Sequence, residues 1–103
     1  MKSSTSNNWN IEFKIWGREG YLFYHEGSQE ISFYWELGGG DTIIGINVPA
    51  LDVWNKQYPW AIERRDQILK LVGQELVKRH QVEFPDCKVD FDEKNGWLQL
   101  REH

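Results

Sequence analysis

The chain has 103 residues and a formal net charge of −4, with 40% hydrophobic and 27% charged residues. This length suits one domain with one core, and the composition excludes both a disordered acidic chain and a membrane-embedded protein. Six Trp, five Phe and four Tyr make 15% of the chain aromatic, so rings carry much of its apolar volume.

The cysteine count and the N-terminus indicate the compartment. Cys87 is the single cysteine and has no partner for an internal disulfide, whereas small secreted domains usually contain several cysteines. The polar start, MKSSTSNNWN, lacks the apolar stretch of a secretory signal, and no run of about 18 apolar residues follows. We expect a cytoplasmic protein without membrane contact, with a disordered tail over residues 1–8 and a single folded domain over residues 9–103.

The first half of the chain alternates apolar and polar residues, which is typical of half-buried β-strands. Glycine-containing turns at residues 17–20 and 27–29 separate the first three of these segments. Two further alternating segments flank the turn Glu93–Gly96 near the C-terminus. The predicted strands are residues 9–15, 21–26, 31–37, 42–48, 88–92 and 97–101.

A long helix is predicted between the fourth and fifth strands. Apolar side chains recur at three- and four-residue steps over residues 59–80, with Ile62 first on the buried stripe. Pro59 suits the first helical position, and the basic residues near His80 suit the negative end of the helix dipole. The other cations of this helix, Arg64 and Arg65 among them, are interrupted by carboxylates, so we expect them on a solvated face.

The predicted fold is α+β with two layers, an antiparallel sheet of about six strands packed on one long helix. The order along the chain is four strands, one helix and two strands. Because one helix of about twenty residues covers only one face of such a sheet, the other face meets water or a partner.

The uncovered face is expected to carry aromatic side chains. If Ile31 and Trp35 face the helix, Tyr34 and Glu36 face outward. The preceding strand then exposes one of two sets of alternate residues, either Tyr21, Phe23 and His25 or Leu22, Tyr24 and Glu26. Exposed Trp and Tyr mark interface hot spots, although cross-strand aromatic pairs that only stabilise the sheet are the alternative reading. The residues that we predict to contact a partner are Trp16, Tyr24, Glu26, Tyr34, Glu36 and Asp41.

The charges are unevenly distributed along the chain. Residues 19–55 contain six carboxylates and neither Lys nor Arg. Such a segment repels nucleic acid and attracts a basic protein, although carboxylates that only confer solubility are the alternative. We therefore expect a protein partner and no nucleic acid.

Catalytic and cofactor signatures are weak. His25 and His80 have no companion at metal-ligand spacing, and Cys87 has no fixed histidine beside it. The loop Gly38–Asp41 is rich in glycine but precedes no helix with a Gly-Lys-Ser/Thr sequence, so it is a turn and not a phosphate cradle. We predict no catalytic residues, no metal and no cofactor.

The middle of the chain resembles small bacterial immunity proteins of polymorphic toxin systems. The resemblance rests on Trp54, the Pro59–Trp60 step, the Arg64–Arg65 pair and the Ile68–Leu69 pair. It implies a cytoplasmic inhibitor that covers the active site of a cognate toxin, often a basic nuclease.

The sequence thus predicts a non-enzymatic binding protein that docks a partner, such as a basic toxin, on its acidic and aromatic sheet face. Two alternatives stay open. One is a homodimeric structural protein that uses the same face, and the other is a small ligand-binding module whose rings stack on its ligand.

Overall fold

A computed structural model describes residues 8–102, so the predicted tail, except for Asn8, lies outside the described residues. The strands are β1 (Trp9–Trp16), β2 (Glu19–Glu26), β3 (Gln29–Leu37), β4 (Thr42–Asn47), β5 (Lys88–Asp92) and β6 (Trp97–Arg101). The helices are α1 (Leu51–Gln57) and α2 (Arg65–His80), with a 3₁₀ turn at Pro59–Ala61 between them. The predicted α+β class and the antiparallel six-stranded sheet are confirmed. Within residues 8–102, no helix combines the length and apolarity needed to cross a membrane.

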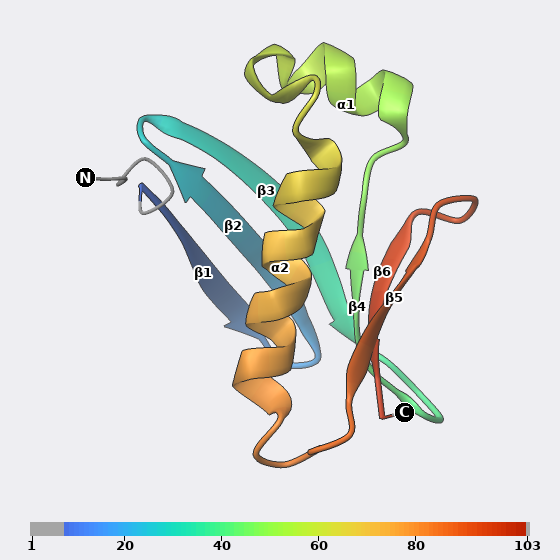
Figure 1. Cartoon of the computed structure of the whole chain (residues 1–103). Coiled ribbons are helices and arrows are strands. Elements are labelled where there is room, and N and C mark those ends of the chain that lie inside the picture. Colours follow the sequence, from blue (N-terminus) through green and yellow to red (C-terminus); the bar gives the residue numbers. More distant parts are fainter. Residues whose placement is uncertain (1–7, 103) are drawn as a thin grey trace.

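The sheet has the strand order β1-β2-β3-β4-β6-β5, and every neighbouring pair is antiparallel. Strands β1 to β3 pair along their whole lengths, whereas β3 and β4 pair only from Trp35 opposite Ile46 to Leu37 opposite Ile44. The sheet therefore divides into two wings, β1–β3 and β4–β6–β5, which diverge from this shared end (Figure 1).

Helix α2 lies across one face of the sheet, and α1 lies beyond the end of β4 (Figure 1). Gly73 lets α2 approach β5, because a Cβ at this position would lie only 3.3 Å from a methyl group of Val89. Trp54 of α1 is fully buried and its ring lies 6.1 Å from that of Phe33, so it packs α1 against β3. The core combines Trp54 with apolar residues of α2 and of the inner face of the sheet.

The long helix begins at Arg65, so the prediction that it begins at Pro59 is wrong. The indole N–H of Trp54 donates to the carbonyl oxygen of Ala61 at 2.9 Å, and the same carbonyl accepts the N–H of Arg64 at 3.1 Å. These bonds close a tight turn and prevent one continuous helix through this segment. Ile62, which was predicted on the buried stripe, is consequently 45% exposed.

Arg65 is buried, contrary to the expected solvated basic face. Its guanidinium donates two hydrogen bonds to the carboxylate of Glu93, at 2.8 and 2.9 Å, and a third to the carbonyl of Pro49 at 2.8 Å. It also lies over the rings of Trp54 and Phe91. Arg65 therefore ties α2 to the segment before α1 and to the β5–β6 hairpin.

We expect Trp54→Ala to lower the free energy of unfolding by about 3–5 kcal/mol, because it empties a buried site and removes the bond to Ala61. Trp60→Ala is the matched comparison, since Trp60 is only partly buried. Urea denaturation of both variants measures the difference. Equal losses would contradict the greater burial of Trp54 and its bond to Ala61 as the source of the difference.

Candidate interaction surface

The face of β1–β3 opposite α2 is formed by alternate residues of the three strands. The register sets Lys14 beside Tyr21, and Tyr21 beside Tyr34. Directly opposite residues of antiparallel strands share a face, so these side chains lie in one line across the wing. Helix α2 packs on the other face, which leaves this line uncovered (Figure 1).

Aromatic rings form a continuous row on this face, and we call Trp16, Tyr21, Phe23, His25 and Tyr34 the aromatic row. Tyr21 is its centre, with its ring centroid 5.9 Å from that of Trp16, 6.3 Å from that of Phe23 and 6.0 Å from that of Tyr34. The ring of His25 stacks on that of Phe23 at 6.2 Å. Trp16 and Tyr21 remain 59% and 41% exposed, so the rings pair with one another and still present surface.

Carboxylates border the aromatic row and are held by it. The Tyr34 hydroxyl lies 2.9 Å from Glu19 and 3.0 Å from Glu36, and these carboxylates, Glu19 first, raise the pKa of Tyr34 above its ordinary value of 10.0. The two ring nitrogens of His25 lie 3.2 Å from Glu12 and 3.4 Å from Glu30. Four glutamates and only one lysine thus occupy the outward positions of the three strands.

Three of the six predicted contact residues lie on this face, namely Trp16, Tyr34 and Glu36. Asp41 lies elsewhere, in the loop before β4, where its carboxylate is 3.1 Å from the guanidinium of Arg101. Asp41 therefore stabilises the end of the second wing and does not border the aromatic row.

Tyr24 and Glu26 lie on the face that α2 covers, so the prediction that they belong to the uncovered face is wrong. The register sets Tyr24 between Ile11 and Ile31, and its side chain is fully buried. Burial and the hydrogen bond that it donates to Glu26 at 2.6 Å raise the pKa of Tyr24 to about 12. Glu26 also forms an ion pair with Arg64 and accepts a hydrogen bond from its guanidinium. This hydrogen bond lowers the pKa of Glu26 below its ordinary value of 4.5.

The length of the β2–β3 turn determines which β2 residues face outward. Glu26 lies opposite Gln29, so only two residues form the β2–β3 turn, and Gly27 has the positive φ of 59° that such a turn requires. A two-residue turn places Tyr24 opposite Ile31 and hence on the helix side. Tyr21, Phe23 and His25 then face outward, and they are the other of the two sets that the sequence left open.

The second wing continues the uncovered face with a different surface. The ring of Trp97 lies over Gly45, where a Cβ would be only 3.1 Å from the ring. A hollow of about 250 Å³ lies between this ring and Glu36, with Gln99 in its wall. Trp97 thus covers β4 and is half-buried, so the exposed rings concentrate on β1–β3.

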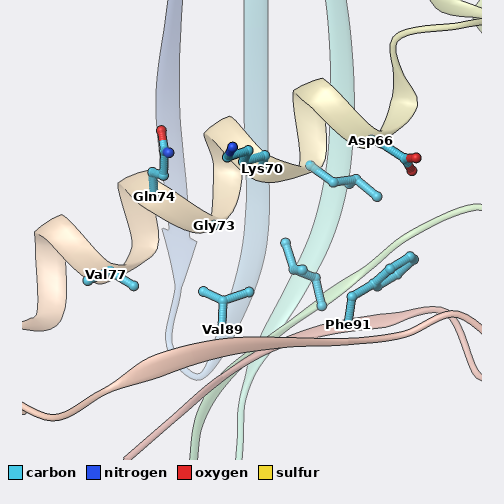
Figure 2. A pocket seen from close by; sticks show the side chains of 9 residues that line it. Asp66, Lys70, Gly73, Gln74, Val77, Val89 and Phe91 are labelled. Carbon is cyan, nitrogen blue, oxygen red and sulfur yellow. The ribbon is translucent and has the colours of Figure 1, made fainter.

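A hollow of about 530 Å³ lies on the helix side, between α2 and β5. Val89 and Phe91 point from β5 toward the helix, whereas Gln74 points away from the strand (Figure 2). Its lining is mainly apolar, and its charged residues are Asp66 and Lys70 of α2. This composition offers a place for apolar atoms and no convergent set of polar groups.

Comparisons with family models, with curated proteins and with solved structures found no match to this chain. Within residues 8–102, no three His, Cys, Asp or Glu side chains gather closely enough to hold a metal ion.

We expect Glu26→Gln to destabilise the protein at neutral pH. The folded-state pKa of Glu26 is below 4.5, so its ionised form stabilises the fold above that pH, and this contribution is lost as the pH falls through the folded-state value. Urea denaturation at neutral pH and well below pH 4.5 should show a gap from the wild type that closes in acid. The exposed Glu83→Gln serves as a control with little gap, and a gap of equal size at both pH values would contradict the role of the Glu26–Arg64 pair.

Proposed function

We propose that the chain is a non-enzymatic binding protein that docks a basic protein on the outward face of β1–β3, as an immunity protein docks its cognate toxin. The observation that carries this proposal is the aromatic row, which is partly exposed on a sheet face that no helix within residues 8–102 covers. The role requires association alone, so no residue of the chain is assigned a catalytic step.

The energetics of the aromatic row favour a protein partner. Trp and Tyr are enriched among the residues that contribute most to protein interfaces. Tyr21 is already fixed by contacts with Trp16, Phe23 and Tyr34, so docking would restrict few further rotamers. The rigid sheet beneath these rings also keeps the surface in one shape.

The charges favour a basic partner. Glu12, Glu19, Glu30 and Glu36 border the rings, and complementary charge accelerates encounter and excludes acidic partners. A toxin that acts on nucleic acid presents cations to phosphate groups, and a rigid array of carboxylates can occupy such a site. The resemblance to immunity proteins points to the same class of partner.

Two double variants separate the contributions of rings and charges. Tyr21→Ser with Tyr34→Ser should weaken partner binding by about thirtyfold or more at any salt concentration, because it removes hot-spot contacts. Glu19→Gln with Glu36→Gln should mainly slow association and reduce its salt dependence. Val82→Ser with Glu83→Gln is the matched control, since it changes an exposed apolar residue and a carboxylate after α2. Surface plasmon resonance measures all three.

The partner is first identified by photocrosslinking in a lysate of the source cells. A photoreactive amino acid at position 23 should capture a basic protein, whereas the same group at position 82 should not. The purified partner should inhibit growth when it is expressed alone, and co-expression of the chain should restore growth unless Tyr21 and Tyr34 are replaced. Equal capture from both positions, or rescue by the Tyr21 and Tyr34 variant, would overturn the proposal.

A further inference from the structure

The two outer strands of the sheet, β1 and β5, differ in how well each could pair with another strand. Strand β1 has eight residues and ends in Ile15 and Trp16, which are 66% and 59% exposed. Strand β5 has only five residues. If two copies of β5 paired antiparallel with Lys88 opposite Asp92, Asp90 of one copy would lie opposite Asp90 of the other. Long apolar edge strands favour pairing, whereas short strands with opposed like charges resist it.

The backbone of β1 presents a regular set of hydrogen-bonding groups at its open edge. The N–H of Gly27 donates to the carbonyl of Asn8 at 3.1 Å, so Asn8 and every second residue after it bond to β2. The backbone groups of Trp9, Ile11, Phe13 and Ile15 therefore point away from β2. Consistently, the Ile11 carbonyl accepts a long 3.4 Å contact from Arg79 of α2.

We propose that two copies of this chain form a dimer by antiparallel pairing of their β1 strands, with Phe13 opposite Phe13 at the twofold axis. This register sets Glu12 of each copy opposite Lys14 of the other, and Ile11 of each copy opposite Ile15 of the other. The two sheets then form one continuous sheet with the six strands of each copy.

Charge complementarity selects this register. Glu12 and Lys14 lie on the uncovered face, 3.3 Å apart within one strand, and both are about half exposed. In the proposed pairing they lie at non-hydrogen-bonded positions, where opposite side chains approach most closely. The dimer therefore contains two Glu12–Lys14 pairs across the junction, and no charge of β1 lies directly opposite a like charge.

The side of the proposed junction that faces α2 is apolar, and the cation there is paired with a carboxylate. Phe13 and Ile15 lie there, and the guanidinium of Arg79 covers the ring of Phe13 at 4.5 Å. Arg79 also pairs with Glu75 at 2.7 Å, so the two copies approach with neutralised pairs and not with bare cations. Pairing would bury Ile15, whose exposure is otherwise unexplained.

The dimer goes beyond the proposed partner binding and does not depend on it. Because both aromatic rows lie on the same side of the continuous sheet, the dimer would present two docking surfaces side by side. It also differs from a homodimer through the sheet face, which would cover the aromatic row.

Sedimentation equilibrium of the full chain tests the proposal. We expect a concentration-dependent mass between 12.3 kDa and twice that value. Glu12→Lys alone and Lys14→Glu alone should each weaken dimerisation by about tenfold or more, because two attractive pairs become repulsive. The double exchange should restore the dimer, and a mixture of the two single variants should form a heterodimer.

Matched charge changes on the other edge, Asp90→Lys and Lys88→Glu, should leave the dimer unchanged. A monomeric wild type across the micromolar range would overturn the proposal. So would a dimer that survives Glu12→Lys but dissociates on Tyr21→Ser with Tyr34→Ser, since that result assigns the interface to the sheet face. Circular dichroism of each variant confirms that the fold is retained, and a double exchange that folds but stays monomeric would exclude this register.

Discussion

One long helix packs on a sheet of six strands, and because it covers only one face, it determines which side chains of the sheet meet solvent. Helix α2 lies on a single face, so all buried apolar side chains of the sheet gather there and the opposite face stays open. An antiparallel sheet tolerates this arrangement because hairpins can join its strands, so no crossover helix has to cover the second face. The open face nevertheless carries rings where polar residues alone would suffice for solubility, and this excess is what requires a functional explanation.

Trp54 and Arg65 hold together the corner where α1, α2 and the β5–β6 hairpin meet. Strands β3 and β4 share only three residue pairs, so the two wings diverge beyond them (Figure 1). Trp54 packs on Phe33 of β3 and fixes the turn before α2 through its bond to Ala61. Arg65 then satisfies the Glu93 carboxylate and the Pro49 carbonyl at the same corner, although its Nε has no hydrogen-bond partner within the described residues. These contacts therefore fix α1, α2 and the β5–β6 hairpin to one another.

The sequence allowed correct prediction of what is set by local pattern. Alternation and glycine turns placed all six strands, because period-two patterning and turn chemistry act over a few residues. Which β2 residues face outward depended on whether two or three residues form the turn at Gly27, and the wrong length moved Tyr24 to the wrong face. The burial of Arg65 depends on Glu93, which is 28 residues away, and the start of α2 depends on a side-chain bond from Trp54 that spans seven residues to Ala61. No local pattern contains that information.

The open face also holds its charges in place before any partner arrives. The Tyr34 hydroxyl lies between Glu19 and Glu36, and the His25 ring lies between Glu12 and Glu30, so each ring orients two carboxylates. Neighbouring carboxylates repel one another, and that repulsion is relieved when a cation from a partner lies among them. Because the rings already fix the positions of these groups, the basic partner that we propose would lose little free energy to ordering them. Aromatic contact and charge selection thus depend on the same few side chains.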